Sequence, residues 1–210
     1  MTGATRLSDL LGSLVDLVLP ADCAGCAAPG PFLCASCAAV LGRLPQTVRP
    51  SPCPPGLPPL AAVAGYDGAL RAMLLAHKEH GRLALSRPLG TALAAAVLVA
   101  SGQPEPSAGP RVPAAPLMLV PMPSAAAARR ARGYDHAGRL AEAARRALRA
   151  AGPPCLVVHA LRQVRPVADQ AGLGAVARAG NLDGAFGIRR RAGDLMAGPV
   201  VLVDDLVTTG

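Results

Sequence analysis

The sequence has few aromatic residues and no tryptophan. Phe, Trp and Tyr make up 2% of its 210 residues, whereas hydrophobic residues as a whole make up 51%. This hydrophobic content is ample for a buried core and argues against a disordered chain. Because the core must be built from Ala, Leu and Val, we expect helices that approach one another closely. The shortage of aromatics also counts against binding single-stranded nucleic acid by base stacking.

Long apolar runs and a nucleotide-hydrolase loop are also missing. The longest apolar run, 89–100, is shorter than the roughly 20 residues of a transmembrane helix. No G-x4-G-K-[ST] motif occurs, which excludes a P-loop hydrolase. The first 23 residues have leucines at helical spacing, but Asp9 and Asp16 interrupt them, unlike a signal peptide. We therefore expect an amphipathic N-terminal helix in a cytoplasmic protein without stable membrane insertion.

The chain is basic, with 21 Lys and Arg against 13 Asp and Glu and a formal charge of +8. A positive charge attracts polyanions of several kinds, including nucleic acid and phosphorylated metabolites. The arginines form clusters, which include Arg129, Arg130 and Arg132 and the run from Arg189 to Arg191. Such clusters are also typical of solvated helix faces, so charge alone does not choose the partner.

Four of the six cysteines form one pattern, "CAGCAAPGPFLCASC". Two C-x2-C pairs are separated by seven residues, a spacing that lets turns aim four thiolates at one tetrahedral Zn²⁺. The predicted structural zinc ligands are Cys23, Cys26, Cys34 and Cys37. The alternative is a pair of disulfides, which a cytosolic protein would not keep. We interpret the remaining Cys53 and Cys155 as a linker residue and a small core residue.

The sequence divides into three parts. Residues 1–42 hold the N-terminal helix and the four cysteines, 43–60 are a proline-rich linker, and 61–210 form the main domain. In that domain the pattern predicts strands near 61–68, 117–124, 155–163 and 199–205, with helices near 68–80, 86–100 and 136–151. Alternating strands and helices favour an α/β fold with a mainly parallel sheet flanked by helices. His77 and His80 on the first helix are expected at the surface.

The closing stretch "GPVVLVDDLVTTG" is a buried strand followed by two acids and a small polar loop. Ligands of an open parallel sheet bind beyond the carboxyl ends of its strands, so Asp204 and Asp205 are expected at the rim of a site. Thr208, Thr209 and Gly210 suit a backbone nest that closes around a phosphate. The segment therefore suits a phosphorylated sugar. In the alternative interpretation, the two acids only cap a following helix.

This stretch resembles the phosphoribosyl-pyrophosphate (PRPP) motif of type I phosphoribosyltransferases. Together with the cysteine knuckle and the segments "LVPMPSAAAARRARGYDHAGRLA" and "QAGLGAVARAGNLDGAF", it makes the chain similar to the ComF/GntX family of competence and DNA-utilisation proteins. The resemblance implies a type I phosphoribosyltransferase-like fold. It also implies that Asp204 and Asp205 contact the ribose hydroxyls of Mg²⁺-bound PRPP, and that Thr208, Thr209 and Gly210 contact its 5′-phosphate.

Other family positions follow from the same resemblance. The loop Pro121–Ser124 matches the pyrophosphate-binding segment, and Arg132 and Gly133 match the family's Arg-Gly-aromatic-Asn-Gln segment. Asp135 and His136 stand where Asn and Gln are usual. A basic, glycine-rich hood over the ligand corresponds to Gln170, Leu173, Arg178, Asn181 and Phe186. Because the family pattern continues into a helix, we expect the 210-residue chain to be a fragment that binds PRPP weakly or not at all.

The favoured function is that of a ComF-like protein that binds PRPP or a related phosphorylated sugar and acts in DNA uptake or utilisation. The first alternative is a phosphoribosyltransferase that moves ribose 5-phosphate from PRPP to an acceptor. Single-stranded DNA and the proteins of DNA uptake or recombination are the further partners that this interpretation implies, through the basic helices. The last alternative is a truncated, non-functional product.

Overall fold

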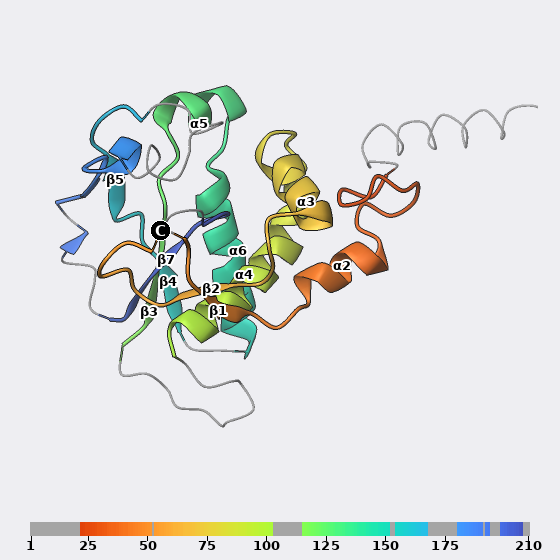
Figure 1. The fold of residues 1–210 in the computed structure, drawn as a ribbon, viewed down its shortest axis with the longest axis horizontal. Coiled ribbons are helices and arrows are strands. Elements are labelled where there is room, and N and C mark those ends of the chain that lie inside the picture. The colour runs from red at the N-terminus through yellow and green to blue at the C-terminus, as the bar shows by residue number, and fades with distance from the viewer. Residues whose placement is uncertain are drawn as a thin grey trace, which may run out of the picture.

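The computed structural model describes residues 22–51, 53–102, 115–151, 154–167, 180–190, 192–193 and 198–207. These residues form a mixed α/β fold in which helices flank a small parallel sheet, and a four-cysteine cluster lies near the N-terminus (Figure 1). The α/β class and the parallel sheet expected from the sequence are thereby confirmed. The expected N-terminal helix and the residues Thr208, Thr209 and Gly210 lie outside the described residues.

The parallel sheet has β3 (Leu117–Pro121) at its centre, with β4 (Cys155–Val157) and β7 (Val200–Val203) on either side. All five residues of β3 are buried, as in a parallel strand covered on both faces. In the register of β3 and β7, Pro121 lies opposite Val203. The carboxyl ends of these two strands therefore lie side by side, although some 80 residues of sequence separate them.

Two antiparallel pairs of strands form separate two-stranded sheets beside the parallel one. β1 (Gln46–Val48) pairs with β2 (Leu60–Ala62), and β5 (Leu161–Gln163) pairs with β6 (Phe186–Ile188). The stretch 43–60 is thus more than an extended linker, because it contains β1 and folds back on the main domain. Its prolines flank the three-residue strand instead of interrupting it, so the backbone N–H groups needed for pairing are present.

The strand expected at 155–163 is two strands. After β4 the chain makes one more bond to the parallel sheet, from Val158 N to Leu119 O, and then turns tightly, with Ala160 N donating to Val158 O. This turn directs β5 away from β4 and into the pair with β6. A continuous apolar pattern does not reveal such a turn, because the side chains on both sides of it are partly buried.

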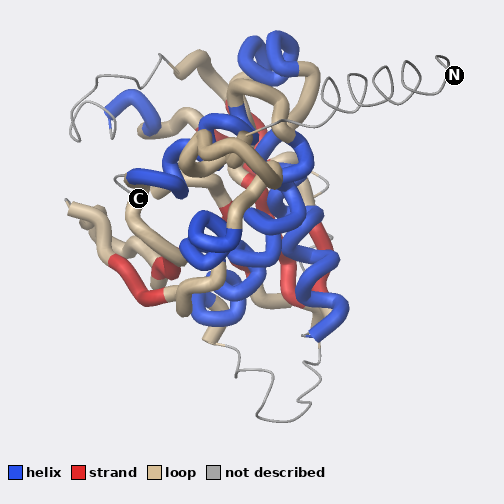
Figure 2. Tube along the Cα trace, turned by 90° about the vertical axis from the view of Figure 1, so that its right-hand side faces the viewer, coloured by secondary structure: helices blue, strands red, loops and turns tan. Residues whose placement is uncertain are grey.

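The helices cover the parallel sheet and one another (Figures 1 and 2). Their bounds are α2 Ala35–Leu41, α3 Gly68–Lys78, α4 Ser86–Ala100, α5 Ala126–Arg132 and α6 His136–Ala151, with a 3₁₀ turn Leu83–Leu85 before α4. One core unites Ala94 and Val97 of α4, Ala141 and Ala144 of α6, and the sheet residue Leu119. α4 and α6 therefore pack together on one face of the sheet.

Small residues allow α4 and α6 to approach closely. A Cβ atom placed on Gly90 would lie 2.3 Å from Cβ of Ala143 and 2.9 Å from its carbonyl carbon. No side chain fits there without movement of a backbone, so the contact needs glycine at this position. This is how a chain with 2% aromatic residues builds its core.

The stretch Leu83–Ala100, with a mean hydropathy of 1.7, is long and apolar enough to cross a membrane by length and composition. The core helix of a soluble protein meets the same criterion, so this is weak evidence for a span. Here the stretch packs between α6, the sheet and β2. The fold is compatible with a soluble protein.

The cysteine segment, red to orange in Figure 1, lies beside α3. Ala24 and Leu41 of this segment share a core with Met73 and Leu74 of α3. Arg82 adds a polar tie, because its guanidinium donates to the carbonyl oxygen of Asp22 at 3.2 Å and to Oδ1 of Asp22 at 2.8 Å. The segment is thus joined to the main domain through α3 and the turn that follows it.

Candidate functional site

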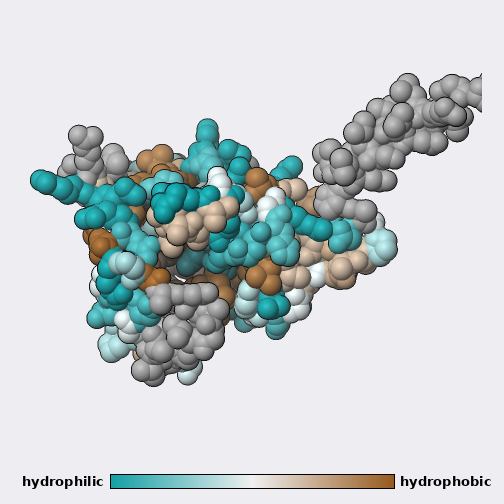
Figure 3. Space-filling view, turned by 90° about the horizontal axis from the view of Figure 1, so that it is seen from above, coloured by the Kyte–Doolittle hydropathy of each residue, from teal (hydrophilic) through white to brown (hydrophobic). Residues whose placement is uncertain are grey.

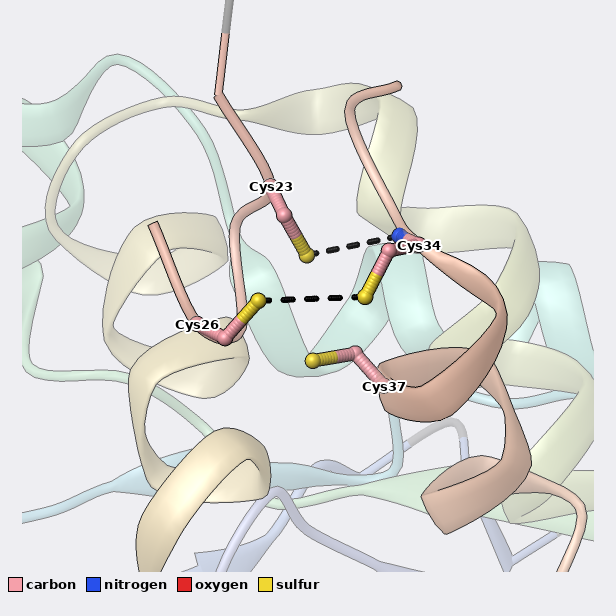
Figure 4. A group of neighbouring side chains, drawn as sticks. All are labelled: Cys23, Cys26, Cys34 and Cys37. Atoms are coloured by element: carbon pink, nitrogen blue, oxygen red, sulfur yellow. Dashed lines mark hydrogen bonds between the residues drawn. The ribbon is translucent and has the colours of Figure 1, made fainter. Parts of the chain in front are cut away.

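The four sulfur atoms of Cys23, Cys26, Cys34 and Cys37 all lie within 4.8 Å of one another (Figure 4). All four cysteines are free, and Sγ of Cys26 and Sγ of Cys34 are 3.8 Å apart. Two sulfurs that each lie 2.3 Å from a tetrahedral zinc ion are separated by about 3.8 Å. The cluster fits a metal such as zinc, and the alternative of two disulfides does not fit it.

Backbone N–H groups also support this cluster. The amides of Gly25 and Cys34 donate to Sγ of Cys23 at 3.4 and 3.3 Å, as is usual around a zinc thiolate. Burial opposes ionisation of Cys23, but these bonds outweigh it and lower its pKa to about 6. Burial, together with the neighbouring cysteines, raises the pKa of Cys37 to about 12. Four thiolates gathered so closely need a cation.

The second polar cluster lies at the carboxyl edge of the parallel sheet. Asp204 and Asp205 follow β7 directly. Oδ2 of Asp205 accepts a hydrogen bond from Nζ of Lys78 at 2.9 Å, and Oδ1 lies 3.6 Å from Nε2 of His136. The Asp205 side chain is 9% exposed, whereas Asp204 is exposed, and Oδ1 of Asp204 accepts from the amide of Asp205 at 2.8 Å.

The segment after β3 completes this edge. Oγ of Ser124 donates to Oδ1 of Asp135 at 3.3 Å and lies 3.2 Å from Nδ1 of His136. His136 is the first residue of α6 and is buried. Asp135 and His136 therefore both belong to this polar cluster, and His136 lies next to Asp205.

The loop between α5 and α6 fixes the end of α3. The hydroxyl of Tyr134 donates to the carbonyl oxygens of His77 and Lys78, at 2.6 and 3.0 Å. These are carbonyls of the last helical turn, which lack partners within the helix. Arg132 adds an ion pair to Glu79 at 3.2 Å. Because α3 is held at this end, the Lys78 side chain reaches Asp205.

The two acids differ in their surroundings. Burial disfavours the charge of Asp205, but the adjacent His136 and the charge of Lys78 outweigh burial and hold the pKa of Asp205 well below its usual range. Packing around the carboxylate and then the charge of Asp205 raise the pKa of Asp204. Asp204 is exposed as a residue, so solvent offsets part of the effect of burial. Asp205 is the anchored anion of the pair and Asp204 the accessible acid.

A cavity with a volume of about 290 Å³ adjoins these acids. Its walls are mostly apolar side chains of α3, α4 and β2, and Asp204, Asp205, Arg49 and Tyr66 supply its polar groups. Seen from above, at the end of the molecule to which β3 runs, the surface is largely hydrophilic and hollowed near its centre (Figure 3). The cluster thus combines charge, solvent access and adjacent apolar space.

Several predicted residues take no part in what the structure describes here. Thr208, Thr209, Gly210, Gln170, Leu173 and Arg178 lie outside the described residues. Phe186 lies in β6. The expectation that His77 is a surface residue is wrong, because His77 is 1% exposed and its Nε2 is 2.9 Å from Oγ of Ser86. His77 continues the buried face formed by Met73, Leu74 and Ala76.

Sequence reasoning did not name Lys78 or His136 as site residues. The signal for His136 was present, since Asp135 and His136 stand where the resemblance described under Sequence analysis leads us to expect two amides. Lys78 had no such signal. Its neighbours along the chain give no hint of a contact with a carboxylate 127 residues away.

Comparison of the chain with protein-family models, curated proteins and solved structures gave no match.

Proposed function

We propose that this chain is a ComF/GntX-like protein with a type I phosphoribosyltransferase-like fold, which binds PRPP or a related phosphorylated sugar and acts in DNA uptake or utilisation. The observation that carries the proposal is the position of Asp204 and Asp205 directly after β7, beside the loop that follows β3. A crevice between neighbouring carboxyl ends is the usual ligand site of an open parallel sheet.

Each group at this edge has a role in the proposal. Asp204 is accessible and accepts hydrogen bonds from sugar hydroxyls, and the segment Pro121–Ser124 faces the diphosphate. Mg²⁺ arrives with PRPP and offsets the charge of its phosphates. Lys78 keeps the positive charge beside Asp205, so the edge does not repel an anionic ligand. Zinc in the four-cysteine cluster has a structural role, because the cluster packs on α3, the helix that carries Lys78.

Catalytic transfer is the alternative for the same site. In this reaction the bond from ribose C1 to the diphosphate breaks, a bond from C1 to an acceptor forms, and pyrophosphate leaves. The cavity beside Asp204 supports this alternative, because an acceptor needs room next to the sugar. Its mostly apolar lining favours an acceptor with an apolar or aromatic body.

The test is calorimetric titration of Mg²⁺-PRPP into the chain and its Asp204→Asn variant. Asp204 is exposed, so this change preserves the fold better than a change of Asp205. We expect the variant to bind at least about tenfold more weakly, because the sugar hydroxyls lose their hydrogen bonds to the Asp204 carboxylate. Asp183→Asn is the matched control, since Asp183 is exposed and lies in the turn before β6. Equal binding by all three proteins would refute the proposal.

DNA binding is a second candidate, favoured by α5. This short helix stands at one end of the molecule in Figure 1 and exposes Arg129 and Arg130, whereas Arg132 is engaged with Glu79. The three arginines are therefore not one free patch. If α5 binds single-stranded DNA, Arg129→Gln/Arg130→Gln weakens binding and reduces its salt dependence by about two charges. Oligonucleotide binding that is independent of salt would contradict this.

A further inference from the structure

Three side chains from two distant segments converge at the carboxyl edge of the sheet. His136 begins α6, and Asp204 and Asp205 follow β7. One ligand atom of each, an imidazole nitrogen or a carboxylate oxygen, lies within 4.8 Å of the other two. The histidine side chain is 6% exposed, so the fold holds it in place against the acids.

The hydrogen bonds of Ser124 determine which ring nitrogen of His136 carries the proton. The other nitrogen then presents a lone pair to the acids. A serine hydroxyl has one proton, and that of Ser124 is donated to Oδ1 of Asp135. Oγ of Ser124 therefore accepts from Nδ1–H of His136, at 3.2 Å. In the neutral ring Nε2 is then unprotonated and points toward Asp205. A ring N–H fixed by an oxygen is the usual outer partner of a metal-binding histidine.

The distance between Nε2 and the acid also fits a shared cation. Nε2 of His136 and Oδ1 of Asp205 are 3.6 Å apart, which is too long for a hydrogen bond. Two ligands that each lie about 2.1 Å from one ion are separated by about 3.6 Å when the angle at the ion is roughly 120°. An ion between the two atoms would thus need little rearrangement.

Lys78 leaves room for this ion. Its Nζ bonds to Oδ2 of Asp205, whereas the histidine faces Oδ1. One lysine neutralises only one of the two carboxylates. Asp204 is exposed, so water or a ligand oxygen has access to complete the coordination shell.

We propose that His136, Asp204 and Asp205 form a divalent-cation site that prefers Mn²⁺ or Zn²⁺ to Mg²⁺. One imidazole with two carboxylates suits these metals, whereas Mg²⁺ favours oxygen ligands and water. Three protein ligands with open positions are typical of a reactive metal site and not of a structural one. The inference does not need PRPP, because the chain itself supplies the three ligands.

The test is a titration of Mn²⁺ into the full chain, loaded first with one equivalent of zinc and kept free of phosphorylated sugar. The EPR signal of free Mn²⁺ weakens on binding and gives the stoichiometry. We expect one Mn²⁺ per chain, and a pulsed EPR spectrum with coupling to a directly bound imidazole ¹⁴N. A tenfold excess of Mg²⁺ should displace little of it, given the ligand preferences above.

Matched variants locate the site. His136→Gln should abolish the nitrogen coupling and weaken binding at least about tenfold, and Asp204→Asn should weaken binding similarly while leaving the fold intact. His80→Gln, at an exposed histidine just beyond the end of α3, should bind as the parent chain does. The proposal is overturned by absence of bound Mn²⁺, by unchanged binding in Asp204→Asn, or by a spectrum without nitrogen coupling. None of these outcomes bears on PRPP binding, which is measured separately.

Discussion

Nζ of Lys78 lies 2.9 Å from Oδ2 of Asp205, although the two residues are 127 positions apart in the sequence. Lys78 ends the helix on which the cysteine cluster packs, and Asp205 follows the last described strand. This ion pair therefore connects the part of the chain that can bind zinc with the carboxyl edge of the sheet. We therefore expect a change in the cysteine cluster to affect the position of the groups at the carboxyl edge of the sheet.

Removal of this ion pair should destabilise the fold. In Lys78→Met the Asp205 carboxylate, 9% exposed, loses its cation and remains beside a buried histidine. We expect a loss of about 1 to 3 kcal/mol in the free energy of unfolding, below the value for a fully buried pair because Lys78 is itself 32% exposed. A double-mutant cycle with Asp205→Asn, measured by urea denaturation, checks this. The double variant should lose less free energy of unfolding than the two single variants together. Simple additivity of the two changes would argue against a direct interaction.

The four-cysteine cluster should carry one zinc ion per chain. Cys26→Ser changes an exposed ligand and should remove the metal, whereas Cys53→Ser, at another exposed cysteine, should retain it. Because the cluster shares a core with α3, metal loss should lower the melting temperature by about 5 to 15 °C, equivalent to roughly 2 to 4 kcal/mol. Metal analysis and thermal unfolding check this. Equal zinc content in both variants would exclude the cluster as the zinc site.

His77 should make stability depend on pH. Burial, followed by the nearby charges of His136 and Arg139, lowers the pKa of His77 from 6.5 to about 4, although Asp205 acts in the opposite direction. Between these two values the unfolded chain binds a proton that the folded chain does not, so stability falls as the pH falls. The loss from pH 6.5 to pH 4 is about 1 to 3 kcal/mol.

Denaturation in urea at several pH values tests this dependence. In His77→Gln, which keeps a polar group near Ser86, the slope between pH 6.5 and pH 4 should be shallower. Asp205 has a depressed pKa, so its contribution is lost only at still lower pH. An unchanged slope in the variant would assign the dependence to other groups.

The close contact of α4 and α6 should not tolerate even one added methyl group. In Gly90→Ala the new Cβ would lie 2.3 Å from Cβ of Ala143, so the helices must separate. We expect a loss of about 1 to 3 kcal/mol despite the better helix propensity of alanine. Gly42→Ala is the control, because φ at Gly42 is −85° and its nearest neighbours allow a Cβ at ordinary contact distances. If both variants are equally stable, the helices are less tightly packed than described.

Much of the fold was predictable because its signals are local. The helices α4 and α6 and the strands β3 and β7 follow from apolar periodicity and from the residues that bound them. The cysteine cluster was predictable for the same reason, since its four ligands lie within 15 residues of sequence. The strand β1 was not, because three residues among prolines have little pattern of their own and need β2 as a partner.

The sequence by itself determined the α/β class, the cysteine group and the placement of two acids after a buried strand. Each of these three features depends on residues that are close together in the sequence, and the spacing of those residues sets the local geometry. Only the tertiary structure decided that His77 is buried and that Lys78 and His136 meet Asp205. These contacts depend on how α3 and α6 are packed against the sheet. Helix packing is set by the combined shape of many small side chains. These side chains come from segments far apart in the sequence, so no short stretch reveals how they fit together.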